Sequence, residues 1–499
     1  MFRGVSRSGL LPVLLFSILG FFTMGYHPGA EDDGVYLAAV KARLNPALFP
    51  HDALFFNLQM RASVFDNWMA HFIRASGLSI AGAELLWQFI SIVLILWACW
   101  NILCRLFDDT AVRWAGTAAV SAMLTLPVAG TALYIADPYL HPRNIATGLI
   151  LLAVARILHA RRLQALPLLA GAMLLHPMMG AFGVSFCLIL SLTLHTPFPQ
   201  RIQAWRGRLA QRQAAAPVAA LVPLGWIFEP PSSAWVEAMR SRHWFWLYQW
   251  SWYEWLGALG PLILFWLTAR VAARRGEHAL ARFATAVLLY GVFQQFVAFI
   301  VCGQQSRLAL ATLEPMRFLH LVYVFMVLIA GALLGRHVLR ERIVRWAVFL
   351  LLANGAMYAA QRQLFSATPH IEFPGPSANP WLQAFDWVHM NTSQDAYFAL
   401  GPRYMAEPGE DMHSFRALAE RSTLADAIKD GSVVSKAPEL ARVWQSQVAA
   451  QNGWKSFRLS DFERLRTAFG VDWVLVDFPP PHGLPCPWHN PRLSVCRIP

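Results

Sequence analysis

The sequence predicts a polytopic α-helical membrane protein of about eleven transmembrane helices, followed by a small C-terminal α/β domain. Of the 499 residues, 56% are hydrophobic and only 14% are charged, whereas a soluble domain is about 25% charged. Apolar runs recur up to Gln361, where the composition becomes mixed. Residues 1–362 are therefore expected to form the membrane domain and residues 363–499 an outer domain of ordinary size.

Each expected span is an apolar run, since about 20 residues are needed to cross the hydrocarbon core. The first run follows Arg3 and Arg7 with no small-residue cleavage site after it, which favours an uncleaved span over a signal peptide. Residues 163–195 form either two spans or a re-entrant hairpin around His176-Pro177. The expected spans are Leu10–Tyr26, Ala83–Cys104, Trp114–Ile135, Ile145–Leu158, Leu163–Leu175, Met178–Leu194, Ala214–Phe228, Leu256–Val271, Phe283–Cys302, Phe318–Leu334 and Val344–Ala360.

Arginine in alternate loops predicts the orientation. The loops near Arg105, Arg161, Arg206, Arg274 and Arg340 are rich in arginine, and the loops between them are poorer in Lys and Arg. By the positive-inside rule the arginine-rich side is cytoplasmic, so the N-terminus is cytoplasmic and the tail is extracytoplasmic. The net charge of +12 thus reflects topology and contact with anionic membrane lipids, not nucleic-acid binding. We expect a multi-pass protein of a bacterial inner membrane.

Three adjacent carboxylates, Glu31, Asp32 and Asp33, lie where the chain leaves the first span. Ionised groups at that depth are costly, so they tend to face a wet cavity and to be functional. The structural alternative is that Asp32 and Asp33 cap a helix starting near Val35.

The rest of the first outer loop, residues 27–82, predicts further helices. Val35–Leu44 is a short helical candidate that Asn45-Pro46 ends. Phe55–Ile73 has near-helical apolar spacing and predicts one amphipathic helix. That helix lies either in the membrane interface or against its own protein.

The tail begins with a proline- and glycine-rich linker at residues 373–380. Helices are expected at Trp381–Met390, Leu440–Ala450 and Asp461–Phe469, and strands at Ala396–Leu400, Trp473–Phe478 and Leu493–Ile498. Cys486 and Cys496 are expected to form a disulfide, which an oxidising exterior allows.

Further polar and aromatic residues fall in the outer loops under this topology, and we take them as candidates for substrate binding. They are His51, Asp52, His141, His176, Glu314, Trp250 and Tyr253. Each has a structural alternative: a helix cap for His51-Asp52, a hairpin turn for His176, and an aromatic belt at the headgroup level for the tryptophans and tyrosines. Their convergence on one side favours an active site built from the roots of the outer loops.

Three arginines, Arg143, Arg307 and Arg317, fall on the same side. An arginine can hold a phosphate through two parallel hydrogen bonds, and carboxylates can deprotonate a hydroxyl or hold a divalent metal. The structural alternatives are an ion pair of Arg143 with Asp137 and snorkelling of Arg317 to the headgroups.

These features resemble the C-type (GT-C) membrane glycosyltransferases, which take a sugar from a polyprenyl-phosphate donor on the outer face. The resemblance rests on the acidic motif Glu31-Asp32-Asp33, the long first outer loop, about eleven spans and the outer domain that closes the chain. It implies a GT-C-like fold and inverting transfer of a hexosyl or pentosyl group from a lipid-linked donor to a lipid or glycan acceptor.

In such enzymes one carboxylate of the acidic motif acts as base on the acceptor hydroxyl, or helps to bind a metal in the oligosaccharyltransferase branch. The resemblance assigns this role to Asp32 or Asp33, with Glu31 in support, and it implies Mg or Mn as a possible cofactor. The candidates for the donor phosphate are Arg317, Arg143 and Arg307. The tail lacks the tryptophan-aspartate signature of the oligosaccharyltransferases, which argues against peptide glycosylation.

Two other classes of function fit the same residues. One is a transporter or flippase of lipid-linked sugars, and the other is a non-catalytic membrane assembly protein. Neutralising Asp32 should stop turnover but spare donor binding in an enzyme. A transporter should transfer no sugar in any assay, and an assembly protein should function without all three acidic residues.

Overall fold

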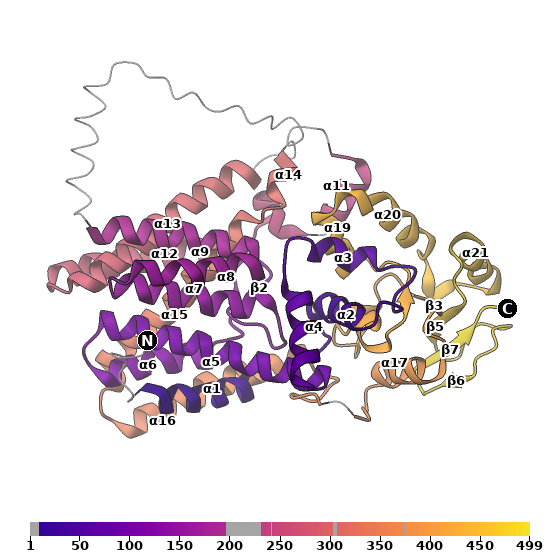
Figure 1. Ribbon diagram of the computed structural model, residues 1–499, viewed down its shortest axis with the longest axis horizontal. Helices are drawn as coiled ribbons and strands as arrows, with labels where there is room; N and C mark the ends of the chain where they lie inside the picture. The colour runs from indigo at the N-terminus through magenta and orange to yellow at the C-terminus, as the bar shows by residue number, and fades with distance from the viewer. Residues whose placement is uncertain (1–8, 196–230, 241, 303–306, 374) are drawn as a thin grey trace, which may run out of the picture.

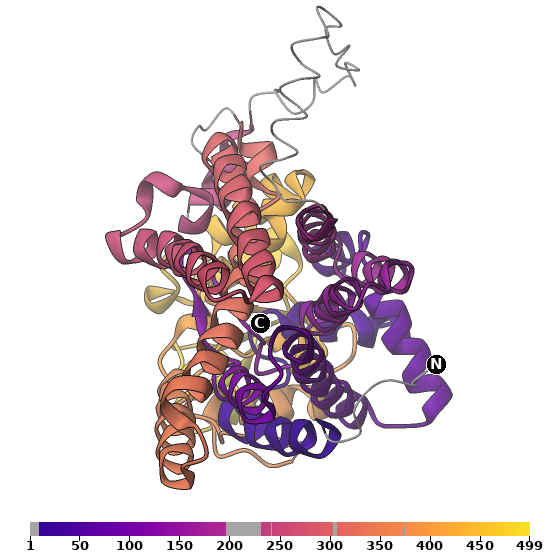
Figure 2. The ribbon, with the colours of Figure 1, turned by 90° about the vertical axis from the view of Figure 1, so that its left-hand side faces the viewer.

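The computed structural model describes residues 9–195, 231–240, 242–302, 307–373 and 375–499. A bundle of long helices forms one side of the molecule and the tail forms the other, with helices of the first outer loop between them (Figure 1). Viewed from the bundle side, the gold and yellow elements of the tail lie behind the bundle (Figure 2). The predicted span Ala214–Phe228 and the arginines from Arg201 to Arg212 lie outside the described residues.

The described part of the bundle contains six helices that are long and apolar enough to cross a membrane. They are formed by α5 (Ile80–Leu106), α9 (Pro177–His195), α12 (Trp252–Arg274), α13 (His278–Cys302), α15 (Leu319–Leu334) with its flanking turns, and α16 (Ile343–Leu364). Leu351 and Leu352 of α16 are 74% and 66% exposed, as expected of an apolar surface that faces lipid. The chain is thus a polytopic helical membrane protein, and the total of about eleven spans stays a prediction.

Four shorter helices complete the described bundle: α1 (Leu10–Met24), α6 (Thr110–Ala122), α7 (Pro142–Leu158) and α8 (Ala165–Leu175). Residues 163–195 form two separate helices, α8 and α9, which pack against each other. With 11 residues, α8 is about 16 Å long, so it is shorter than the hydrocarbon core of about 30 Å.

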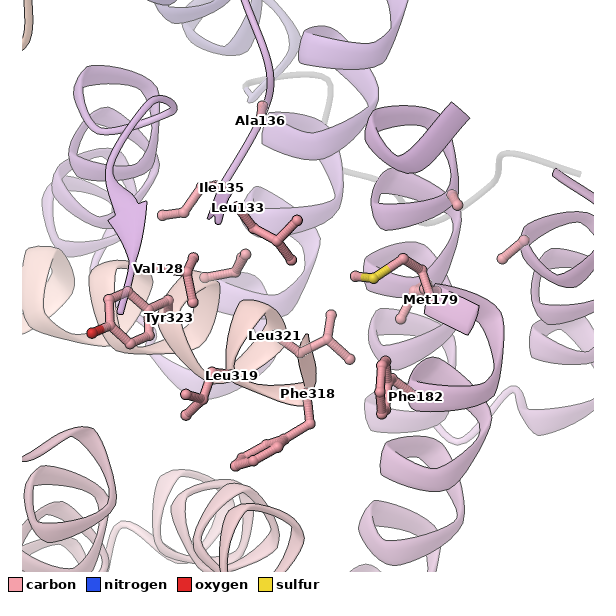
Figure 3. Close-up of a cluster of buried hydrophobic side chains, with 14 of the residues drawn as sticks. Val128, Leu133, Ile135, Ala136, Met179, Phe182, Phe318, Leu319, Leu321 and Tyr323 are labelled. Atoms are coloured by element: carbon pink, nitrogen blue, oxygen red, sulfur yellow. The ribbon is translucent and has the colours of Figure 1, made fainter. Parts of the chain in front are cut away.

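The prediction of one span over Trp114–Ile135 is wrong at its second half. Helix α6 ends at Ala122, and the chain then forms an antiparallel pair, β1 (Pro127–Val128) with β2 (Leu133–Tyr134). Pro127 cannot donate to a helical ladder, and Gly130 adopts a φ of +64° against the ring of Trp250. Apolar side chains of this hairpin lie beside those of α15 and α9 (Figure 3).

The first outer loop contains three helices, α2 (Asp33–Leu44), α3 (Leu54–Met60) and α4 (Phe65–Ser76). The predicted helix at Val35–Leu44 is confirmed, but the single amphipathic helix over Phe55–Ile73 is wrong. The break lies at Ser63, whose hydroxyl donates to Leu175 O and accepts from Phe65 N. Phe65, Met69 and Ile73 of α4 are buried, because α4 packs on α2 and α5.

The tail contains the helices and strands that the sequence predicts. The helices are α17 (Pro380–Asn391), α20 (Ala441–Ala450) and α21 (Leu459–Phe469), and the strands are β3 (Tyr397–Leu400), β5 (Trp473–Asp477) and β7 (Leu493–Arg497). Two short strands that were not predicted, β4 (Ser422–Thr423) and β6 (Trp488–His489), complete a sheet of order β4-β3-β5-β7-β6. Strand β3 is parallel to β4 and β5, and β7 is antiparallel to β5 and β6. The predicted disulfide between Cys486 and Cys496 is confirmed, with an S–S distance of 2.04 Å.

Two further tail helices dock on the rest of the molecule. Helix α18 (Phe415–Ala419) packs on α2, and α19 (Lys429–Lys436) packs on α3 and on α11 (Ser233–Arg240). Val433 and Val434 of α19 belong to the same buried apolar cluster as the bundle helices. The docking of α19 therefore brings tail side chains to the acidic motif.

Candidate active site

Segments far apart in the sequence meet around a cavity of about 20 Å³ at the tail end of the bundle. The cavity is bordered by the start of α2, the start of α7, the α8–α9 junction, the 3-10 turn Pro315–Phe318 before α15, and α19. Its lining residues are Asp32, Val35, Tyr36, His141, Arg143, His176, Arg317, Lys429, Ser432 and Lys436. Five residues that the sequence singled out, Asp32, His141, Arg143, His176 and Arg317, thus share one cavity.

Asp32 presents its carboxylate to this cavity. Its Oδ1 accepts a hydrogen bond from Lys429 Nζ at 3.0 Å, and its Oδ2 lies 3.8 Å from His141 Nε2. The same ammonium is paired with Glu31. Burial opposes ionisation, but Lys429, His141 and Arg143 outweigh it and hold the pKa of Asp32 well below its usual value. The Asp32 side chain remains 32% exposed, so an ionised and accessible carboxylate faces the cavity.

Asp33 is in a different environment, although it is the next residue. Its side chain is buried, and its Oδ2 accepts a hydrogen bond from Gly29 N at 2.6 Å. Burial, opposed by the Gly29 hydrogen bond and by Lys41, raises the pKa of Asp33 to about 7. Asp32 is the N-cap residue of α2 but makes no capping hydrogen bond through its side chain. The side-chain cap that the sequence offered as an alternative is therefore absent at Asp32, whereas Asp33 lies in the first turn of α2.

Arg143 enters the cavity from the first turn of α7. Its guanidinium is bound by the carboxylate of Asp137. Arg143 Nη2 donates to the two carboxylate oxygens at 2.7 and 2.8 Å, and Arg143 Nε donates to Oδ2 at 3.2 Å. The ion pair that the sequence offered as an alternative is thus present. It leaves Arg143 Nη1 buried without a hydrogen-bond partner among the described residues, and an unpaired buried donor of this kind is costly unless a ligand satisfies it.

Arg317 and Lys436 share the carboxylate of Glu314. Arg317 Nε lies 3.0 Å and Lys436 Nζ 3.4 Å from Glu314 Oε2, while Trp244 Nε1 donates to Glu314 Oε1 at 3.2 Å. Burial lowers the pKa of Lys436, and Glu314 opposes this effect.

The charges around the cavity balance one another. The cations are Arg143, Arg317, Lys429 and Lys436, and their carboxylate partners are Glu31, Asp32, Asp137 and Glu314. An anion in this cavity would therefore be held by directed N–H donors rather than by an excess of positive charge.

Several predicted residues do not line this cavity. His51 stacks on Tyr397 with ring centroids 4.5 Å apart. Asp52 is buried and accepts hydrogen bonds from Arg416 Nε at 2.6 Å and Thr423 N at 3.0 Å. Both residues therefore connect the first outer loop to the tail sheet.

The remaining predicted residues lie elsewhere on the bundle. Arg307 Nη1 donates to Ile300 O at 2.6 Å. Trp250 packs on Gly130 and on Trp255, whose ring centroid is 5.6 Å away, and Tyr253 is 60% exposed. The exposed Tyr253 agrees with the aromatic-belt alternative, whereas Trp250 is buried and packs inside the protein.

Sequence reasoning missed Lys429 and Lys436, which the tail contributes. They are the first and last residues of α19 and, seven residues apart, lie about two helical turns apart on one side of the helix. That spacing was the available signal, but Gly431 and the pair Val433-Val434 have low helix propensity, and the helix was not predicted.

The residues at the acidic motif do not fit a divalent cation. Within the described ranges no group of three or more His, Cys, Asp or Glu side chains could hold a metal ion. Moreover, the ammonium of Lys429 lies against both Glu31 and Asp32, and a metal ion at the same oxygens would meet that positive charge.

No protein-family model and no curated protein matches the sequence. Among solved structures, the chain is similar to the archaeal oligosaccharyltransferase AglB from Archaeoglobus fulgidus in complex with an inhibitory peptide and a dolichol-phosphate, with 13% identity, a TM-score of 0.48, and coverage of 94% of this chain and 69% of that one. It is also similar to the Archaeoglobus fulgidus oligosaccharyltransferase in complex with Zn and sulfate, with 12% identity, a TM-score of 0.47, and coverage of 94% and 67%. Neither likeness assigns a role to any residue of this chain.

Proposed function

We propose that the protein is a membrane glycosyltransferase that moves a sugar from a polyprenyl-phosphate donor to a lipid or glycan acceptor on the extracytoplasmic face. The observation that carries the proposal is the cavity that joins the carboxylate of Asp32 to the donors of Arg143, Arg317 and Lys436. A base beside a set of phosphate-binding cations is the combination that glycosyl transfer from a phosphate requires.

In the proposed reaction the acceptor hydroxyl lies at Asp32 and the donor phosphate lies toward Arg317 and Lys436. The acceptor oxygen attacks the anomeric carbon while its proton passes to Asp32. The bond from that carbon to the phosphate oxygen breaks, and polyprenyl phosphate leaves with the bonding electrons. This single displacement inverts the anomeric carbon, and the cations stabilise the charge that develops on the leaving phosphate.

The size of the cavity sets a condition on this reaction. The space of about 20 Å³ that it leaves for the centre of a water-sized sphere is room for about one water molecule, since a cavity needs about 10–15 Å³ of such space to hold one. A sugar phosphate therefore enters only after part of the lining moves. Helix α19 contributes Lys429, Ser432 and Lys436 to one wall of the cavity.

The neighbouring carboxylates provide a matched test. We expect Asp32→Asn to lower the transfer rate by about 10²–10⁴-fold, the usual effect of losing a positioned base, while donor binding is kept. Asp33→Asn should stay near the wild-type rate because Asp33 bonds to Gly29 and does not line the cavity. Purified protein would be assayed with a panel of labelled polyprenyl-phosphate sugars. If Asp32→Asn transfers sugar at the wild-type rate, Asp32 is not the base. If the wild-type protein transfers sugar from none of the donors, a transporter is favoured.

A further inference from the structure

Lys429 connects the tail to the first two carboxylates of the acidic motif, Glu31 and Asp32. It is the first residue of α19, and its Nζ donates to Glu31 and to Asp32 Oδ1, residues almost 400 positions earlier in the chain. Its side chain is only 15% exposed. The opposite oxygen, Asp32 Oδ2, faces His141 and not Lys429. The ammonium therefore neutralises the motif from one side and leaves the other side of Asp32 for an acceptor.

The backbone of Lys429 is fixed by a second group of buried charges. Asp426 Oδ1 accepts hydrogen bonds from Ile428 N and Lys429 N, both at 2.6 Å. Arg416 then joins α19 to the first outer loop, since its Nη1 and Nη2 donate to the two oxygens of Asp430 at 3.1 and 3.2 Å and its Nε donates to Asp52. The ammonium thus reaches the motif from a rigid support.

We propose that Lys429 is the resident cation of the acidic motif and takes the place that a divalent metal would occupy, so that sugar transfer by this protein requires no metal. A divalent ion such as Mg²⁺ needs about six oxygen ligands in near-ideal geometry, whereas an ammonium needs only three acceptors. Glu31 and Asp32 supply two of them from one turn of chain. The part of this inference that concerns transfer rests on the proposed function, and the part that concerns metal binding does not.

Titration with Mn²⁺, followed by electron paramagnetic resonance on the purified full-length protein, tests the metal-binding part. Wild type should bind no Mn²⁺ at Asp32, so wild type and Asp32→Asn should bind the same amount of Mn²⁺. Lys429→Ser should gain about one equivalent of bound Mn²⁺, and the double variant Lys429→Ser/Asp32→Asn should lose it again. Lys455→Ser is the matched control, because Lys455 pairs with Glu407 on the exposed surface of the tail, and it should behave as wild type.

Two results of the titration would overturn the proposal: an equivalent of Mn²⁺ on wild type that Asp32→Asn removes, or a normally folded Lys429→Ser variant that gains no site. If Lys429→Ser does not fold, the comparison of wild type with Asp32→Asn decides alone. Bound Mn²⁺ that Asp32→Asn removes contradicts the proposal, and equal Mn²⁺ binding by the two proteins supports it.

Transfer assays form the second arm. Wild type should keep its full rate after treatment with EDTA, and Lys429→Ser should lose about 10²–10³-fold, the usual effect of removing one preorganised electrostatic group. Added Mn²⁺ should restore part of that loss, and inactivation of wild type by EDTA would contradict the proposal. A protein that transfers no sugar under any condition would refute the proposed function, while the Mn²⁺ titration would still decide the role of Lys429.

Discussion

Arg317 and Arg307 are only ten positions apart, yet they have different surroundings. Arg317 lines the cavity beside Glu314 and Lys436, whereas Arg307 bonds to the end of α13 through Ile300 O. A hydrogen bond to a charged group contributes about 1.5–3 kcal/mol. We therefore expect Arg317→Ala to raise the donor KM by about 10–100-fold and Arg307→Ala to leave it unchanged. Initial rates against donor concentration would measure this, and equal effects of the two variants would refute the assignment of the phosphate to Arg317.

Individual site residues could be predicted only where the local sequence already showed the chemistry. Asp32 and Arg143 lie next to span ends, where a charge is unusual enough to notice. Lys429 lies in an ordinary polar stretch of the tail, and its meaning depends on contacts with Glu31 and Asp32 far along the chain. No local pattern encodes such a pairing. The acidic residue and the arginines of the site could therefore be predicted from the sequence, but the lysines could not.

Helices α6 and α15 approach closely because small residues face each other. A Cβ at Gly331 would lie 2.4 Å from Ala119 Cβ and 2.9 Å from Ala115 O, and a Cβ at Gly116 would lie 2.8 Å from Leu328 O. Small residues at such contacts allow membrane helices to pack backbone to backbone.

Enlarging one of these residues should therefore separate the pair. We expect Gly331→Val to destabilise the protein by about 1–3 kcal/mol, the usual cost of overpacking, which would lower the Tm in detergent. Gly355→Val in α16 is the control, since no atom lies within 4 Å of a Cβ at Gly355. Equal Tm values for Gly331→Val and Gly355→Val would show that the α6–α15 contact is not tight.

At the level of elements, the sequence predicted the tail better than the hairpin after α6. Strands such as β5 alternate with clear helices and are bounded by turn residues, so their period is visible locally. Residues 114–135, by contrast, carry no charged side chain, and a largely apolar run alone does not distinguish a continuous span from a helix followed by a buried hairpin. Pro127 is a local signal against a continuous helix, but the packing of Trp250 on Gly130 in the hairpin is not local.

On the scale of the whole molecule, Glu372 joins the end of the first span to the tail. Its two oxygens lie 2.5 Å from His27 Nδ1 and 3.0 Å from His413 Nε2, and its backbone N–H donates to Tyr26 O at 2.9 Å. Burial raises the pKa of Glu372, but the hydrogen bonds from the two histidines outweigh burial and lower it to about 2.

This shift gives a pH dependence with a defined sign. Because the pKa of Glu372 is lower in the folded state than its usual 4.5, the ionised group stabilises the fold above pH 4.5, and this stability is lost as the pH falls toward 2. The contribution is at most about 3 kcal/mol. We expect Glu372→Gln to lower the Tm at pH 6 and the difference from wild type to shrink on going to pH 3. Glu407→Gln, at an exposed ion pair, should show no such trend, and a constant Tm difference for Glu372→Gln would contradict the linkage.

The arginine-rich loops and the candidate active site lie at opposite ends of the bundle. Arg105 Nε donates to Leu158 O, and Arg336 Nη1 donates to Glu277 Oε1. Because the Arg336 guanidinium also lies 6.0 Å from the centre of the Phe107 ring, the loops after α5, α7, α12 and α15 meet at one end. The cavity and the tail lie at the other end. If the arginine-rich end is cytoplasmic, Asp32 and α19 are extracytoplasmic.

Reporter fusions test this orientation directly. Alkaline phosphatase fused after Pro499 should be active, because that enzyme folds only in an oxidising exterior, which is also where the disulfide of Cys486 with Cys496 persists. The same reporter after Gly276, in the loop that follows Arg274 and Arg275, should be inactive, and a fluorescent protein at that point should fold in the cytoplasm. Activity of both phosphatase fusions would place the two ends of the bundle on the same side, which a helix spanning between them does not allow. The reverse pattern would put the cavity in the cytoplasm and would exclude an extracytoplasmic donor.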